Sequence, residues 1–302
     1  MVLVTGITGK SGTWFLKRLI DEKENLTETK FRVIVRNSSN VELIDTSGLP
    51  IEKAYGDLND ASFIEKSMEN ISTVLHIAGI HTSIKVVEAA INKNVKRLIL
   101  VHTTGIYSKY KTASAEYIAI EKHIEEIITN RNIDMTILRP TMIYGSISDR
   151  NVIVFIKMVD KLRFFPVINH AKYLLQPVYE KDLGDAYYQV LVNADATRNK
   201  NYILSGKEPI LLIEMLKIIG NYLKKKNAFI SVPFPIAYFG AHLLCLLTIG
   251  KIDYREKVQR LIEPRAFPHI EASSDFGYSP VSFKEGVKKE IIEYTSKNVR
   301  KE

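Results

Sequence analysis

Three glycines near the start of the chain have the spacing of a loop that binds phosphate groups. The stretch "TGITGKSG" places Gly6, Gly9 and Gly12 after the apolar run "VLVT" and before a segment with helical periodicity. One glycine allows a tight turn, and a later one lets a pyrophosphate reach the backbone where free N–H groups begin a helix. The pattern predicts a dinucleotide-binding turn between a strand and a helix.

A cation follows the second expected strand, "FRVIVRN" at 31–37. Proteins that select NAD place a carboxylate at the end of this strand for the ribose hydroxyls, whereas the 2′-phosphate of NADP needs a cation. Arg36 stands there, and the next carboxylate is Glu42. A guanidinium binds phosphate through two hydrogen bonds, so Arg36 favours NADP over NAD. A solvated arginine without a ligand is the alternative, which leaves the choice open.

Strand-like and helix-like segments alternate along the first half of the chain. Further apolar runs at 72–79, 95–105 and 133–145 read as strands, with helical patterns between them. This alternation predicts an α/β fold, namely a Rossmann doubly wound parallel sheet with helices on both faces and a smaller C-terminal substrate lobe.

The length bounds the domain organisation. A chain of 302 residues, of which 46% are hydrophobic, can bury a sizeable core as one large domain or two. We expect residues 1–145 to form the NAD(P)-binding core, with 171–204 returning to it. Residues 146–170 and 205–302 are expected to form mainly the substrate lobe.

Composition argues against several classes of protein. The formal net charge of +8 arises from 42 basic and 34 acidic residues, and no basic stripe is interleaved with aromatic residues, so we expect a solvated surface and no nucleic-acid partner. The single cysteine, Cys245, allows no disulfide within the chain, and a reducing cytoplasm fits best. The histidines lack ligand spacing, so no metal is expected.

The N-terminus has a strand pattern, so we expect no secretory signal. The most apolar segment is "FPIAYFGAHLLCLLTIG" at 234–250, which is slightly short for a bilayer span and contains His242 and two glycines. We expect this segment to form a buried helix, with membrane contact as the less favoured alternative.

The order of the motifs resembles the short-chain dehydrogenase/reductase superfamily. The resemblance covers nearly the whole chain and is closest to the extended and atypical branches, which include nucleoside-diphosphate-sugar epimerases and dehydratases. Beyond the glycine loop, it is carried by "YGDLND", "HIAG", "VKRLILVHTTGIYS", "TILRPTMIYG", "QPVYEKDLGDAY" and "GYSPVSFKEGVKKEI".

The resemblance implies a cofactor site. It assigns the glycine loop to the pyrophosphate, Asp57 to the adenine, and the "HIAG" loop to backbone contact with the cofactor. With Arg36 for the 2′-phosphate, the full set of expected cofactor residues is Gly6, Thr8, Gly9, Lys10, Ser11, Gly12, Arg36, Asp57, Leu58, Ala78, Gly79, Pro140 and Ile143.

The resemblance also implies an activity on a small molecule. We expect an epimerase, dehydratase or reductase that acts on a nucleoside-diphosphate sugar or a related carbonyl compound, in a chain compatible with a homodimer. Arg139 and Arg150 are candidates for binding an anionic group of the substrate, with salt bridges inside the protein as the alternative. The rival class is an NADP-binding sensor or assembly subunit that has lost redox catalysis.

The expected catalytic pair departs from the pattern of the superfamily. Its members pair a tyrosine and a lysine as Y-x-x-x-K on a helix, but here Tyr117 is followed by Lys122 five positions later. A five-residue step leaves the two side chains about 140° apart on a regular helix, so Lys122 faces solvent unless a π-bulge intervenes. Glu121 takes the lysine position, where a carboxylate raises the pKa of a nearby phenol.

A second Y-x-x-x-K occurs in "YSKYK", from Tyr107 to Lys111. Its place directly after an expected strand favours a loop, in which Tyr107 faces the substrate and Thr103 or Thr104 orients a carbonyl group. Packing of these residues is the alternative. The candidate catalytic residues are therefore Thr104, Tyr107 and Tyr117.

Overall fold

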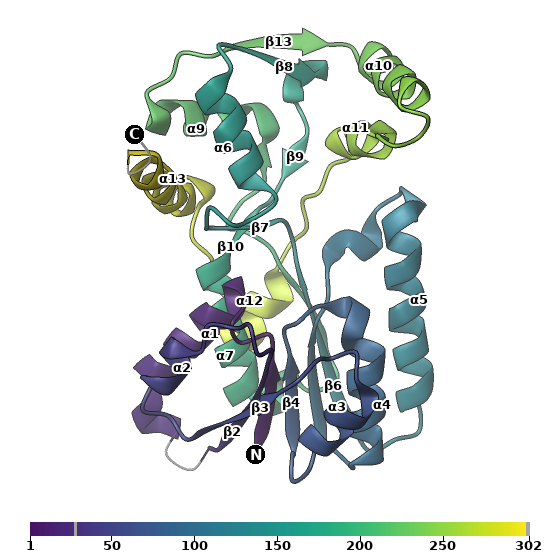
Figure 1. The fold of residues 1–302 in the computed structure, drawn as a ribbon, viewed down its shortest axis with the longest axis vertical. Coiled ribbons are helices and arrows are strands. Elements are labelled where there is room, and N and C mark those ends of the chain that lie inside the picture. The colour runs from purple at the N-terminus through teal and green to yellow at the C-terminus, as the bar shows by residue number, and fades with distance from the viewer. Residues whose placement is uncertain (27–28, 300–302) are drawn as a thin grey trace.

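A sheet of seven parallel strands lies at the centre of one lobe (Figure 1), in the order β11-β6-β5-β4-β1-β2-β3. The computed structural model describes residues 1–26 and 29–299. The strands are β1 (Val2–Thr5), β2 (Phe31–Val35), β3 (Ile51–Tyr55), β4 (Thr73–His76), β5 (Arg97–Val101), β6 (Asp134–Pro140) and β11 (Asn201–Leu204). The predicted Rossmann-like α/β fold is confirmed.

Helices cover both faces of this sheet because neighbouring strand residues point to opposite sides. Val2 and Val4 of β1 join the core under α1 (Lys10–Asp21), whereas Leu3 joins the core on the other face. The first face also carries α2 (Glu42–Asp45), α7 (Glu180–Val192) and α12 (Ile270–Phe276). The second carries α3 (Ala61–Ser67), α4 (Ser83–Asn92) and α5 (Lys111–Ile128).

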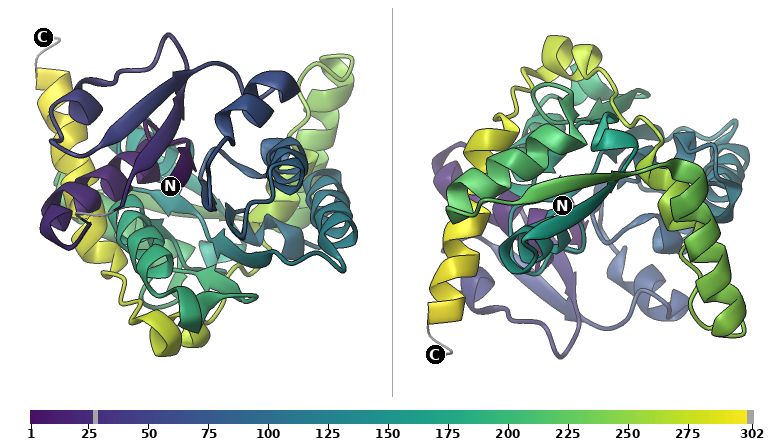
Figure 2. Two further views of the ribbon diagram at one scale, coloured as in Figure 1. Left: turned by 90° about the horizontal axis from the view of Figure 1, so that it is seen from below. Right: turned by 90° about the horizontal axis from the view of Figure 1, so that it is seen from above.

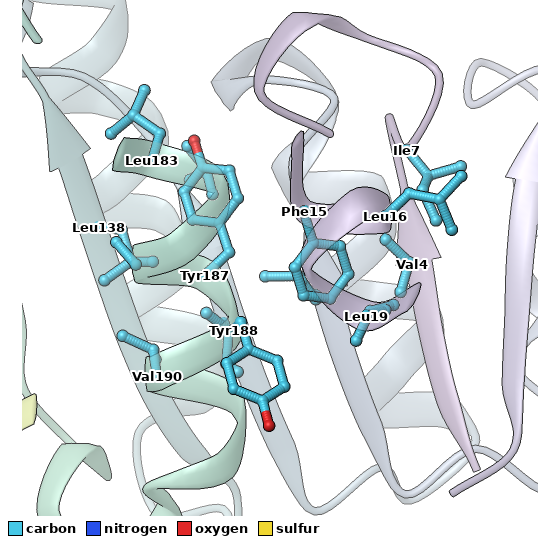
Figure 3. Close-up of a cluster of buried hydrophobic side chains, with 14 of the residues drawn as sticks. Val4, Ile7, Phe15, Leu16, Leu19, Leu138, Leu183, Tyr187, Tyr188 and Val190 are labelled. Atoms are coloured by element: carbon cyan, nitrogen blue, oxygen red, sulfur yellow. The ribbon is translucent and has the colours of Figure 1, made fainter. Parts of the chain in front are cut away.

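The contact between α1 and α7 is close enough to need a glycine. A Cβ atom on Gly184 would lie 2.6 Å from the backbone of Trp14 and Phe15. Figure 3 shows Phe15 of α1 facing Tyr187 and the neighbouring side chains of α7. Burial of such large side chains contributes about 1.5–3 kcal/mol each, so this seam fixes the position of α1.

The second lobe is built around two parallel strands, β8 (Phe164–Ile168) and β13 (Ala228–Val232). Buried side chains of α6 (Val152–Lys161), α9 (Leu212–Leu223) and α13 (Phe283–Val299) form its core. Figure 2 shows α10 (Phe234–Leu247) at the edge of this lobe, away from that core. Next to α10 packs α11 (Arg255–Leu261).

Short elements connect the two lobes. One small pairing, β7 (Ile143–Tyr144) with β10 (Val178–Tyr179), lies where the chain crosses between them, and a second, β9 (Leu174–Leu175) with β12 (Ile210–Leu211), lies in the second lobe. The remaining short helices are η1 (Lys23–Leu26), η2 (Ile80–Thr82), η3 (Thr104–Tyr107), η4 (Asn169–Ala171) and α8 (Ala194–Thr197).

The apolar segment at 234–250 forms a helix as predicted, but the expectation that this helix is buried is wrong. Only Ala241 of α10 is buried. A helix at the edge of a lobe packs on one face only, so the apolar residues of the other face stay in contact with solvent. Within the described part of the chain, no helix is both long and apolar enough to cross a bilayer.

Candidate functional site

The glycine loop folds tightly onto its own backbone at the carboxyl end of β1. Gly6 has a positive φ of 73°, and a Cβ on it would lie 2.7 Å from the backbone nitrogen of Ala78. A Cβ on Gly12 would lie 2.1 Å from the carbonyl oxygen of Gly6. A side chain at residue 12 would therefore clash with the loop itself, before any ligand is considered.

His76 ties the glycine loop to the loop after β4. Burial lowers the pKa of His76 to about 4, so its imidazole is neutral near pH 7. Nε2 lies 3.0 Å from the carbonyl oxygen of Gly79, which can only accept, so Nε2 carries the proton. Nδ1 then accepts from the Thr5 hydroxyl at 2.7 Å, and Thr5 Oγ1 accepts from the Ala78 N–H. The two loops are thereby held in register.

The other expected cofactor residues also lie at the carboxyl ends of the parallel strands. Arg36 follows β2 and is exposed, and Asp57 lies in the exposed turn after β3, where it accepts hydrogen bonds from the backbone and side-chain amides of Asn59. Pro140 ends β6, and Ile143 begins β7. The fold therefore places these residues along one edge of the sheet, as a dinucleotide site requires.

Glu42 lies closer to the glycine loop than its position in the sequence suggests. With Thr8 and Thr13 it lines a cavity of about 400 Å³ beside α1. Sequence reasoning missed this proximity because Glu42 belongs to the first turn of α2, after a loop of unpredictable path. A carboxylate and the Arg36 guanidinium are thus both available to the ribose that is expected there.

A cleft of about 290 Å³ opens between the carboxyl ends of β5 and β6 and the segment after α11. Thr103, Thr104 and Tyr107 line it from the first lobe, and the Thr104 hydroxyl donates to the carbonyl oxygen of Pro140 at 3.2 Å. Glu263 approaches from the other side and accepts hydrogen bonds from Ser108 and the Lys109 backbone N–H. These bonds connect the two lobes across the cleft.

Tyr117 and Lys122 do not converge on this cleft. The helix α5 is α-helical throughout, and the Lys122 side chain is 74% exposed and pairs with Glu126 at 3.8 Å. Tyr117 packs against the ring of His81, under Gly105, and is not among the residues that line the cleft. Of the three candidate catalytic residues, the structure brings Thr104 and Tyr107 together in the cleft and leaves Tyr117 outside it.

Glu121 is buried in an ion pair. Its two carboxylate oxygens accept from Nε and Nη2 of Arg139 at 3.1 and 2.5 Å, and His102 Nδ1 lies 2.9 Å away. Burial raises the pKa of Glu121, but the hydrogen bonds of His102 and Arg139 outweigh it and lower the pKa overall. Arg139 therefore forms a salt bridge inside the protein, which was the alternative to binding an anionic substrate group. Its guanidinium lies 5.9 Å from the ring centre of Tyr107.

This network is connected like a serine-hydrolase triad, but its serine is buried and cannot reach a substrate. His102 Nε2 lies 3.1 Å from Ser83 Oγ, and Nδ1 contacts Glu121, as a nucleophile, base and carboxylate would be connected. Ser83 is 0% exposed, however, so its hydroxyl cannot reach a substrate. The network holds α4, β5, α5 and β6 together.

Two arginines that sequence reasoning missed face the cleft. Arg260 of α11 and Arg265 both line it, and burial together with the charge of Arg260 lowers the pKa of Arg265. Among the described residues, no carboxylate lies within salt-bridge distance of either guanidinium, and the Nε atom of each is buried without a hydrogen-bond partner. Glu263 lies in the same cleft and partly offsets the charge of Arg265, but it forms no salt bridge with either arginine, so the two half-buried guanidinium groups remain candidates for binding an anion.

Behind the arginines lies an apolar cavity of about 490 Å³. Side chains of α6, β8, α9 and α11 line it, among them Phe155, Phe165 and Leu216. Arg150, the other arginine expected to bind an anion, is exposed at the rim of this second cavity. A ligand that fills both cavities would have an apolar part next to its anionic group.

Two buried carboxyl groups meet at the start of α6. Asp149 Oδ2 and Glu290 Oε1 are each buried with no donor in the described structure, and the two side chains interact. Burial and the neighbouring Asp149 raise the pKa of Glu290 to about 10. One proton shared between the two carboxyl groups accounts for both unpaired oxygens.

The comparison with protein families agrees with this geometry. A model described as NAD(P)H-binding matches residues 6–157, which include the glycine loop, the "HIAG" loop and α5. The chain belongs to the NAD(P)H-binding family. The match confirms the dinucleotide-binding part of the expected resemblance, and the solved structures below agree with its fold.

Two curated relatives of this family member match over part of their lengths. NADH dehydrogenase [ubiquinone] 1 alpha subcomplex subunit 9, mitochondrial, of Arabidopsis thaliana is 29% identical over 113 residues, or 37% of this chain and 28% of that protein. Sterol demethylase protein B of Methylococcus capsulatus is 37% identical over 76 residues, or 25% of this chain and 21% of that protein. The matched part of the chain thus spans less than a third of either relative.

Solved structures align over nearly the whole chain. UDP-glucose 4-epimerase of Thermotoga maritima, solved with UDP-glucose, has a TM-score of 0.72 at 16% identity and covers 98% of this chain and 99% of its own. The dTDP-glucose 4,6-dehydratase DesIV of Streptomyces venezuelae, solved with NAD bound, has a TM-score of 0.73 at 16% identity, with 98% and 97% covered. At this identity the likeness establishes the fold.

The shared proton of Glu290 predicts how stability depends on pH. The carboxyl group holds its proton up to about pH 10 in the folded chain but loses it above its ordinary pKa of 4.5 in the unfolded chain. The free energy of unfolding therefore falls as pH rises between these values, by up to about 1.4 kcal/mol per pH unit. Glu290→Gln cannot ionise, so its melting temperature should fall less than that of the wild type between about pH 5 and pH 9. The exposed Glu24→Gln is the control, and parallel curves for Glu290→Gln and the wild type would show that no proton is held there.

Proposed function

We propose that this chain binds NADP and acts as an epimerase, dehydratase or reductase on an anionic carbonyl compound, with nucleoside-diphosphate sugars as the candidate class. The observation that carries the proposal is the pair Arg260 and Arg265, which lines the cleft together with Thr104 and Tyr107 and whose Nε atoms have no hydrogen-bond partner in the described structure. A diphosphate is a suitable counter-charge for two guanidinium groups. The solved epimerase and dehydratase structures with the same fold support this class of substrate.

The preference for NADP rests on Arg36. Its guanidinium is exposed at the end of β2 and has no hydrogen-bond or ion-pair partner among the described residues, so it is available to a 2′-phosphate. Glu42 is the competing group, since a carboxylate beside the ribose favours NAD. We favour NADP because its phosphate would gain two charge-assisted hydrogen bonds from Arg36.

In the proposed mechanism, NADP supplies or accepts the hydride when bound, and the protein moves the proton. Tyr107 is the phenol that lines the cleft, and it exchanges a proton with the carbonyl oxygen of the substrate. The Thr104 hydroxyl, held by Pro140, orients that oxygen. The Arg139 guanidinium beside the Tyr107 ring is the nearby cation, in place of the lysine that the superfamily uses.

A second candidate function is a subunit of a larger assembly that binds the dinucleotide without redox catalysis. The specific observation in its favour is Glu121, which occupies the lysine position and neutralises Arg139, the nearby cation. The relative from Arabidopsis thaliana is itself named as a subunit. Binding of NADP without turnover of any sugar nucleotide or simple carbonyl compound would favour this candidate.

Cofactor choice tests the proposed role of Arg36. Calorimetry with the full chain should show that NADPH binds at least about fivefold more tightly than NADH, because only NADPH has the phosphate that pairs with the guanidinium. Arg36→Glu should abolish or reverse this preference, and the exposed Arg131→Glu should retain it. Equal affinities in the wild type would contradict the assignment.

Kinetics of single variants test whether Tyr107 or a residue of α5 transfers the proton. With a substrate found among sugar nucleotides and NADPH present, Lys122→Ala should keep kcat/KM within about threefold of the wild type, because its side chain points to solvent. Tyr107→Phe should lower kcat/KM by about tenfold to a thousandfold, the range expected for loss of a proton donor. If Lys122→Ala instead lost that much kcat/KM and Tyr107→Phe lost none, the catalytic residues would lie on α5.

A further inference from the structure

The helix α10 exposes a continuous apolar stripe. Its large apolar side chains recur three or four positions apart, which places them along one face of the helix, and each is between 45% and 74% exposed. The stripe consists of Ile236, Phe239, Leu243, Leu246 and Leu247. Beyond the end of the helix, Ile249 is 90% exposed and extends the apolar surface.

The opposite face of α10 is apolar as well. It carries Ala241, which is buried, and Leu244 and Cys245, which are partly buried. The whole segment from 234 to 250 contains no Lys, Arg, Asp or Glu. A helix that is apolar on all sides belongs in a core or a membrane, yet only one side of α10 is covered by this chain.

The position of α10 makes the stripe convex and accessible. In Figures 1 and 2 the helix stands at a corner of the substrate lobe, and its neighbour along that edge is α11. A projecting apolar helix fits a flat, deformable apolar phase.

The lobe that carries α10 holds the excess positive charge of the chain. Residues 151–179 and 207–265 contain 14 of the 42 basic residues but 6 of the 34 acidic residues, which accounts for the whole net charge of +8. Lys251 follows α10 directly, whereas Lys224, Lys225 and Lys226 lie at the other end of β13, where Lys225 pairs with Asp160. Asp253, the nearest acidic residue, is already paired with Arg255.

We propose that α10 docks this chain onto an anionic lipid bilayer, with the stripe in the interfacial region and Lys251 at the headgroups. Fourteen residues are too few to span the hydrocarbon core, so the helix lies in the plane of the membrane. The apolar stripe supplies burial, and each lysine near an anionic surface adds attraction. This surface is separate from the glycine loop and from the cleft.

Vesicle sedimentation of the full chain tests this proposal. The wild type should sediment with vesicles of phosphatidylcholine mixed with phosphatidylserine, and more weakly with phosphatidylcholine alone. The double variant Phe239→Asp/Leu246→Asp should bind the mixed vesicles about tenfold more weakly or worse, because two charges enter the stripe. Ile270→Asp/Ile292→Asp is the matched control, since both residues are exposed apolar residues of other helices and the change in net charge is the same.

Three results would overturn the proposal. They are no sedimentation of the wild type with either vesicle, equal losses in the two double variants, and a wild-type oligomer that Phe239→Asp/Leu246→Asp dissociates without lipid. The last result would assign the stripe to a second copy of the chain. Thermal melting and NADPH affinity of both double variants should match the wild type, because none of the four residues touches the dinucleotide loop.

Discussion

The close backbone contact around the glycine loop is the constraint on which the rest of the site depends. Gly12 lets the first turn of α1 rest on the carbonyl of Gly6, and Gly184 lets α7 approach the backbone of α1. With α1 fixed in this way, the free N–H groups of its first turn lie at the carboxyl end of β1, beside the glycine loop. The Thr5–His76 hydrogen bond then aligns the loop after β4 with it.

The second defining interaction is the buried pair of Glu121 and Arg139. Glu121 takes the lysine position of the expected Y-x-x-x-K pattern, and the ion pair makes this position a structural one. Removing one partner would leave an unpaired buried charge, which costs several kcal/mol. Under the proposed function, the proton transfer must therefore come from a residue other than the one at this position.

The sequence was informative where a local rule governs the structure. The glycine spacing predicted the loop, the alternation of apolar runs predicted the parallel sheet, and helical phase predicted that Lys122 points to solvent. Arg260 and Arg265 could not be predicted because more than a hundred residues separate them from the strands whose ends they face. The exposure of α10 was missed because a helix that is apolar on both faces has no periodicity to show which face is covered.

A crystal structure of the chain with NADPH bound tests the central claim most directly, by showing which groups surround nicotinamide C4. We expect C4 to face the cleft, with the hydroxyls of Thr104 and Tyr107 nearest and Arg260 and Arg265 on the far side. We also expect Glu121 to stay paired with Arg139 when the cofactor is bound. A nicotinamide ring directed at Tyr117, with Lys122 turned inward by a distortion of α5, would contradict this claim.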